Sequence, residues 1–254
     1  MRALRVSVLT SFSASLAVTV WSMLATHNHV LHILHVILVS LTFLQIAVYL
    51  LKSAEIASLR NYRELCLRMT VDPDAAFIGS VRTGSPVFNA CAGALAKYGI
   101  YVRQPDSMKT LEERRIIAAE GNSPSREGYE IARSTLTKIG FVFSDDPGDC
   151  PVSIFIGPFE YEHRETADFV LVCNKAAHLL TAAYISRVYL RHTKYDRILL
   201  IAACLCAAAL LFFKQFPYAA AALAAGAAAE VYLVRHIERL TARLSFDSIT
   251  RYFI

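Results

Sequence analysis

Four histidines near the N-terminus form the first group of residues whose types and spacing could do chemistry. They are His27, His29, His32 and His35, and the last two share a helical face because they lie three residues apart. Neutral imidazole binds zinc, copper or haem iron. No cysteine or carboxylate lies near them in the sequence to complete a familiar ligand set. We therefore assign no metal or cofactor and interpret these histidines as residues of the membrane surface, with a metal site as the alternative.

Glu230 is the second candidate, because it is an acidic residue inside an otherwise apolar stretch. It follows the alanine-rich run Ala219–Ala229, whose small side chains permit close approach of helices. A carboxylate in a membrane helix is costly and normally faces a partner or a cavity. Glu230 therefore predicts either a structural polar contact or a step in a proton relay. Arg235 follows after roughly one and a half helical turns, which favours the structural role near the membrane edge.

Catalytic motifs are missing from the sequence. It contains no HExxH, no GxSxG and no glycine-rich phosphate-binding loop. The formal charge of +5 comes from basic residues that are mixed with acidic ones, which does not suit a nucleic-acid surface. We therefore predict a protein that is not an enzyme and has no nucleic-acid partner.

Four apolar segments contain or flank the histidines and Glu230. Their order in the sequence predicts two helical hairpins. The segments are Val6–Leu24, Val30–Leu51, Ile198–Phe213 and Tyr218–Val234. A hydrocarbon core about 30 Å thick needs roughly 20 apolar residues, a length that the first pair reaches and the second only approaches. Backbone amides in lipid must bond internally, so each segment is predicted to be a helix. The sequence thus indicates a membrane protein with four transmembrane helices.

Basic residues flank these segments on the same side each time. The flanking cations are Arg2, Arg5, Lys52, Arg60, Arg63, Arg68, Arg187, Arg191, Lys194, Arg197, Arg235, Arg239 and Arg243. The positive-inside rule then places both termini and the middle of the chain on the cytoplasmic or matrix side. No acidic residue precedes Glu55, so the N-terminus suits a mitochondrial presequence as well as a signal anchor. We interpret it as a retained first span.

The middle of the chain is predicted to fold as a small α/β domain with antiparallel, ferredoxin-like packing. Two junctions, Lys97–Gly99 and Lys138–Gly140, each place a lysine in the last helical turn and a glycine at the left-handed cap. The expected helices are Pro86–Gly99, Leu111–Glu120, a helix ending at Ile139, and Lys175–Asp196, which leads into the third span. The expected strands are Ile100–Gln104, Phe141–Ser144, Val152–Gly157 and Phe169–Asn174.

The predicted organisation is a transmembrane hairpin (1–52), a soluble α/β domain (53–196), a second hairpin (197–236) and a basic tail (237–254). From this we predict a non-enzymatic accessory subunit of a larger membrane complex. Its partners would be other membrane subunits and the lipid bilayer, and the mitochondrial inner membrane suits it better than a bacterial plasma membrane. The alternative is an oligomeric channel or transporter with Glu230 in the transport path and the soluble domain as sensor.

Overall fold

The structure is a computed structural model, and it divides the chain into two compact units. One unit combines Met1–Ile56 with Tyr195–Leu233, and the other combines Ala57–Lys194 with Val234–Ile254. The described residues are 33–50, 86–103, 105–121, 126–144, 150–157, 167–171, 178–213 and 215–242, with the single residues Thr10, Ser13, Ala14, Ala17, Leu65, Leu244 and Ile249. The predicted span Val6–Leu24 therefore lies almost wholly outside the described residues.

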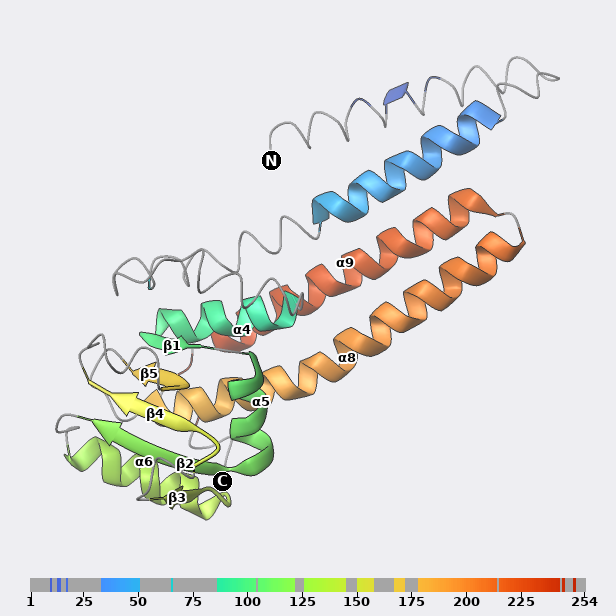
Figure 1. Ribbon diagram of the computed structural model, residues 1–254. Helices are drawn as coiled ribbons and strands as arrows, with labels where there is room; N and C mark the ends of the chain where they lie inside the picture. Colours follow the sequence, from blue (N-terminus) through green and yellow to red (C-terminus); the bar gives the residue numbers. More distant parts are fainter. Residues whose placement is uncertain are drawn as a thin grey trace. The chain divides into compact units, whose positions relative to one another are not determined.

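Three of the described helices are long and apolar enough to cross a membrane (Figure 1). They are the helix Ile33–Leu50, helix α8 (His178–Phe212) and helix α9 (Phe216–Thr241). Each overlaps one of the predicted spans, so the described residues contain candidates for three of the four predicted membrane helices. Helix α8 also runs without a break from His178 through Asp196 into the apolar segment, which confirms the predicted continuous helix.

Small side chains hold the helical unit together. Ala47 of the helix Ile33–Leu50 is buried with Ala224 and Ala227 of α9, and Phe43 packs against this group. Gly226 of α9 lies so close to α8 that a Cβ atom placed on it would be 2.7 Å from the Cβ of Ala203. Small residues let membrane helices approach closely, and close packing then replaces the hydrophobic driving force that is missing in lipid.

The second unit contains a mixed five-stranded sheet with the order β1-β5-β4-β2-β3 (Figure 1). Strand β1 is antiparallel to β5, and the other neighbouring strands are parallel. The strands are β1 (Ile100–Val102), β2 (Ile116–Gly121), β3 (Val142–Ser144), β4 (Ser153–Ile156) and β5 (Phe169–Leu171). The helices that accompany them are α4 (Pro86–Lys97), α5 (Pro105–Arg114) and α6 (Arg126–Lys138).

The predicted antiparallel, ferredoxin-like packing is wrong, and so is the predicted helix Leu111–Glu120. Helix α5 ends at Arg114, and Ile116 begins β2, which pairs in parallel with both β3 and β4. Parallel neighbours need a crossover connection, and α6 supplies it between β2 and β3. The buried Ile117 lies on this inner strand, between β4 and β3, so the sheet cannot be assigned correctly once β2 is taken for helix.

The two helix-to-strand junctions are confirmed. Gly99 has φ +69° and Gly140 has φ +93°, both in the left-handed region that glycine enters without steric cost.

The core of the α/β unit is filled by large apolar side chains. Those that are fully buried include Phe88, Leu95, Ile100, Met108, Leu111, Ile117, Leu136, Phe141, Ile154, Ile156, Phe169 and Leu171.

The end of α9 is bound to the α/β unit through Tyr98. Its hydroxyl donates to the carbonyl oxygen of Thr241 at 2.8 Å and accepts from the amide of Leu244 at 3.1 Å. Tyr98 lies directly between α4 and the left-handed Gly99. One phenol therefore connects the turn before β1 to the residues that follow α9.

Candidate functional site

Arg115 organises a polar cluster where α5, α6 and α8 meet. Its backbone has φ +55°, and its amide donates to the carbonyl of Leu111 at 3.2 Å, so it acts as a left-handed cap of α5. A non-glycine residue in this region is strained by about 1 kcal/mol. Its own carbonyl then accepts from the amide of Val142 at 2.8 Å and begins the pairing of β2 with β3.

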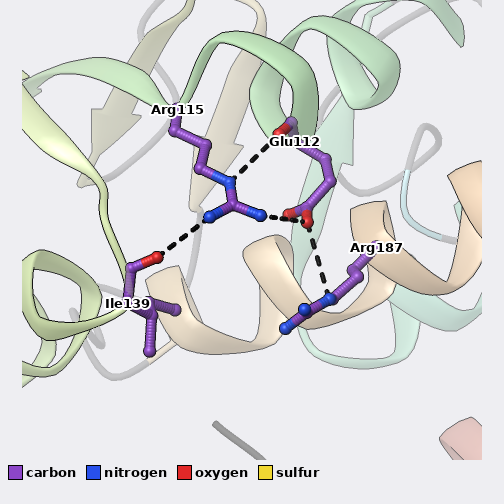
Figure 2. Close-up of polar contacts among 4 residues, drawn as sticks. All are labelled: Glu112, Arg115, Ile139 and Arg187. Carbon is purple, nitrogen blue, oxygen red and sulfur yellow. Dashed lines mark hydrogen bonds and ion pairs between the residues drawn. The ribbon is translucent and has the colours of Figure 1, made fainter.

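The guanidinium group of Arg115 donates to three acceptors on two elements (Figure 2). Nε donates to the carbonyl of Glu112 at 3.3 Å, and Nη2 donates to the Glu112 carboxylate at 3.0 Å. Nη1 donates to the carbonyl of Ile139, after the end of α6, at 3.0 Å. The guanidinium also lies over the ring of Phe141, 5.8 Å from its centre. Arg115 therefore holds the C-terminal ends of α5 and α6 together.

The carboxylate of Glu112 forms a second ion pair, with Arg187 of α8. The Nε of Arg187 lies 3.5 Å from the same carboxylate oxygen that pairs with Arg115 (Figure 2). The side chain of Glu112 is only 8% exposed, whereas those of Arg115 and Arg187 are each 38% exposed. A buried carboxylate is tolerated when it is paired and hydrogen-bonded, and here one carboxylate is shared by two guanidinium groups.

A polar cavity of about 240 Å³ opens beside this cluster. It is lined by Glu112, Arg115, Lys138, Ile139, Phe141 and Arg187. Three of these side chains are cationic and one is anionic. Lys138, in the last turn of α6, has no hydrogen-bond or ion-pair partner among the residues that the structure describes. Among the described residues that line the cavity, cationic side chains therefore outnumber anionic ones, and Arg115 and Lys138 lie at the negative ends of two helix dipoles.

The structure places Glu230 in α9, partly buried and near Asp196 of α8. The two carboxylates lie close enough for their charges to interact. Asp196 immediately precedes Arg197, where the apolar segment of α8 begins. Both carboxylates therefore lie at the ends of their apolar segments, next to Arg197 in α8 and five residues before Arg235 in α9.

The histidine cluster is only partly described. His35 lies partly buried on the helix Ile33–Leu50, whereas His27, His29 and His32 lie outside the described residues. Among the residues that the structure describes, no three His, Cys, Asp or Glu side chains come together as a possible metal site. The metal alternative for the N-terminal histidines therefore stays a prediction.

A different histidine pair connects α8 and α9 in the α/β unit. His192 and His236 have ring centres 5.8 Å apart, and Nδ1 of His192 donates to the carbonyl of Val188 at 2.8 Å. Burial lowers the pKa of His192, the charges of His236 and Arg191 act in the same direction, and the hydrogen bond to Val188 opposes them. The pKa of His192, which precedes the apolar segment, is thus shifted below the ordinary value for histidine.

The outward side of α9 carries a surface that we call the alanine face. It consists of Ala221, Ala225 and Ala228, which recur every three or four residues, with Tyr218 and Tyr232 at its two ends. Ala225 and Ala228 are exposed and Ala221 is partly exposed, while the two tyrosines are 64% and 69% exposed. The apolar segment of α8 exposes bulky aliphatic residues, namely Ile198, Leu200, Ile201, Leu205 and Leu211, together with the alanines Ala202, Ala208 and Ala209.

Comparisons with protein families, with curated proteins and with solved structures gave no match to this chain. The site must therefore be interpreted from its own chemistry. Sequence reasoning noticed Lys138 as a helix-end cation and Arg187 as a topology signal, but it did not bring them together. Glu112 and Arg115 were missed, and their only sequence signal is their position at the end of a charged run before β-branched residues.

Proposed function

We propose that this protein is a non-enzymatic integral membrane subunit that assembles laterally with helices of other membrane proteins. The observation that carries the proposal is the alanine face of α9. Leucine, isoleucine and phenylalanine side chains cover apolar area well against lipid, whereas small residues gather where one membrane helix packs against another. An outward face built from Ala221, Ala225 and Ala228 therefore suits a partner helix better than lipid.

The two tyrosines at the ends of the alanine face support a location of this face inside a lipid bilayer. Tyr218 and Tyr232 lie 14 residues apart in the sequence, which corresponds to about 21 Å along the helix axis. Tyrosine prefers the two membrane interfaces, where its ring lies at the level of the headgroups. The face between these two residues would then lie at membrane depth.

We also propose the orientation and location of the subunit. The cations Arg191, Lys194, Arg235 and Arg239 are exposed at the ends of the apolar segments nearest the α/β unit. The positive-inside rule therefore supports a cytoplasmic or matrix location for this unit and for both termini. The basic, acid-free N-terminal sequence supports the mitochondrial inner membrane over a bacterial plasma membrane.

The channel or transporter alternative depends on Glu230. Its neighbour Asp196 lies beside Arg197, and Arg235 follows Glu230 by about 7 Å along α9. Both carboxylates therefore lie near cations at one end of the apolar segments. This arrangement supports a structural contact, and we favour the accessory subunit over a transport path.

Replacing Ala225 by leucine tests the proposed assembly. The larger side chain overfills a close helix–helix contact, at a cost of about 1–3 kcal/mol, so recovery of copurifying membrane partners should fall roughly tenfold or more. The measurement is purification in mild detergent followed by quantitative mass spectrometry and native gel electrophoresis.

The matched control is Ala208→Leu, which makes the same change at an exposed position of α8 among bulky aliphatic residues. That variant should keep its partners because it only adds lipid-facing area. A wild-type chain that purifies as a monomer without partners contradicts the proposal. Equal recovery of partners with the Ala225 and Ala208 variants contradicts the assignment of the alanine face.

A further inference from the structure

We propose that the α8–α9 hairpin fits a bilayer whose hydrocarbon core is thinner than usual, at about 21–24 Å instead of about 30 Å. The surface that meets this lipid is the apolar part of the hairpin, which ends in a tip of exposed aromatic residues. The inference rests on the proposed membrane location of α8 and α9. It does not depend on the alanine face or on a partner protein.

The apolar run in α8 is short for a membrane span. It begins after the charged residues Asp196 and Arg197, and it extends from Ile198 to Phe213, which is 16 residues. At about 1.5 Å per residue, this run measures about 24 Å along the helix axis. It is therefore about 6 Å shorter than an ordinary hydrocarbon core of about 30 Å.

The apolar run in α9 is shorter still. It extends from Phe216 to Ala229, which is 14 residues or about 21 Å, and Glu230 follows it. Asp196 of α8 lies close enough to Glu230 for their charges to interact, and both residues belong to the same helical unit. The two runs therefore start from the same polar level and end together at the turn that joins the helices.

The turn between the helices adds no length toward the far membrane surface. Helix α8 ends at Phe212, and α9 begins at Phe216. The amide of Gln215 donates to the carbonyl of Leu210 at 2.8 Å, and its own carbonyl accepts from the amide of Ala219 at 3.0 Å. Gln215 is thus bonded to both helices. The hairpin ends where its helices end, without a polar loop that could extend the span.

Exposed aromatic residues gather at this tip. The side chains of Phe212 and Phe213 are 83% and 70% exposed, and their rings pack edge to face with centres 5.6 Å apart. Phe216 and Tyr218 are also exposed. An exposed apolar patch of this kind marks a surface for lipid, and tyrosine prefers the headgroup level. These residues favour a tip at the boundary between hydrocarbon and headgroups over a tip that projects into water.

A span shorter than the hydrocarbon core forces the bilayer to thin around it, at a free-energy cost that rises with each Å of mismatch. The helix Ile33–Leu50 does not oppose a thin bilayer. It has 18 residues and is about 27 Å long, and a helix longer than the core adapts by tilting. The lipid partner that suits the hairpin is therefore one with short acyl chains.

The experiment measures the thermal stability of the full chain in nanodiscs of three phosphatidylcholines. These are dimyristoleoyl-, dioleoyl- and dierucoyl-phosphatidylcholine, in order of increasing chain length, and helix content is the signal. We expect the highest unfolding midpoint in the dimyristoleoyl lipid and a midpoint lower by roughly 5 °C or more in the dierucoyl lipid. A midpoint that is highest in the dioleoyl or dierucoyl lipid, or equal in all three, overturns the inference.

The matched control is a lengthened hairpin with four leucines inserted after Leu211 and four after Tyr218. Each insertion adds about 6 Å to its helix, and both lie on the tip side of the contact between Gly226 and Ala203. The lengthened variant should be more stable in the dioleoyl or dierucoyl lipid than in the dimyristoleoyl lipid. The same lipid order for both proteins overturns the inference, because the preference then does not come from the length of the hairpin.

Labelling of cysteines locates the tip in the same nanodiscs, which are open to water on both faces. A variant whose sole cysteine is Gln215→Cys should react rapidly with a membrane-impermeant maleimide in the dimyristoleoyl lipid, because position 215 is exposed and lies at the tip. Protection of this cysteine in all three lipids overturns the inference, since the tip then never reaches the far surface.

A variant with Cys204 as its sole cysteine separates this inference from the proposed function. Cys204 lies within the apolar run of α8 and should be protected in every lipid. If it is protected and the chain has no lipid preference, this inference alone fails and the proposed assembly stands. If Cys204 is labelled in every lipid, the membrane location fails, and both proposals fail with it.

Discussion

Replacing Gly226 by alanine is expected to destabilise the α8–α9 hairpin by about 1–3 kcal/mol, the typical cost of overpacking. Helix propensity alone predicts the opposite, because alanine in a helix interior is favoured over glycine by about 1 kcal/mol. The contact decides the sign. A Cβ at position 226 would lie 2.7 Å from the Cβ of Ala203, and neither atom can rotate away. Gly226→Leu should separate the two helices altogether.

A double-mutant cycle tests this contact. Ala203→Gly removes the opposing Cβ, so the variant carrying both Gly226→Ala and Ala203→Gly should regain most of the stability that Gly226→Ala loses. The measurement is the unfolding free energy of the full chain in detergent by chemical denaturation, with helix content as the signal. A Gly226→Ala variant that is more stable than the wild type, with no coupling to position 203, would refute the close packing.

Replacing Glu112 by glutamine should destabilise the α/β unit by about 2–3 kcal/mol. The change keeps the shape of the side chain but leaves Arg115 and Arg187 without their shared counter-charge. Removing one partner of a fully buried ion pair costs about 3–5 kcal/mol, and solvent screening of the two partly exposed guanidinium groups reduces this figure. Hydrogen exchange should report the loss as faster exchange of β2 and β3, because Arg115 lies directly before β2.

Glu113→Gln is the matched control for this change. Glu113 is the next residue of α5 and is exposed, so the same loss of charge should change the stability by less than about 0.5 kcal/mol. Adding Arg187→Gln to Glu112→Gln should restore part of the protection, because one of the two cations that lost the Glu112 carboxylate is then gone. Identical exchange rates for the Glu112 and Glu113 variants would show that the cluster contributes nothing to the fold.

The elements that the sequence predicted well are those with local chemical signals. Three of the four predicted apolar segments form helices long and apolar enough to span a membrane, and they were recognisable from length and hydrophobicity. The junctions at Gly99 and Gly140 were recognisable because a glycine after a helix-ending lysine favours the left-handed cap, and both adopt it. In each case the physical cause lies within a few neighbouring residues.

Strand β2 could not be recognised in the same way. The charged run that ends at Arg115 continues directly into Ile116 and Ile117, and no glycine or proline separates helix from strand. Arg115 itself breaks the helix by adopting φ +55°, and its guanidinium is held by carbonyl groups of α5 and of the turn after α6. This conformation depends on a tertiary contact, which local propensity does not contain.

The candidate site escaped prediction for a related reason. Glu112, Lys138 and Arg187 are far apart in the sequence, and each has an ordinary explanation when taken alone. Likewise, the sequence marks Glu230 as a carboxylate within an apolar run. Its neighbour Asp196 lies on α8 next to Arg197, so the sequence around it carries no such signal. Charges that gather from separate elements become visible only when the packing of those elements is known.

The position of Cys204 in the bilayer tests the central claim most directly. A variant with Cys204 as its sole cysteine is reconstituted in lipid vesicles and treated with a membrane-impermeant maleimide. The reference is a variant whose sole cysteine is Lys109→Cys, on the exposed surface of α5, in vesicles with this unit outside. Cys204 is exposed on the surface of the chain, so in vesicles that contain the purified chain alone its protection from the reagent reports burial in lipid. Our account predicts rapid labelling at position 109 and labelling of Cys204 only after the vesicles are dissolved in denaturing detergent. Equal labelling of both positions in intact vesicles would contradict it.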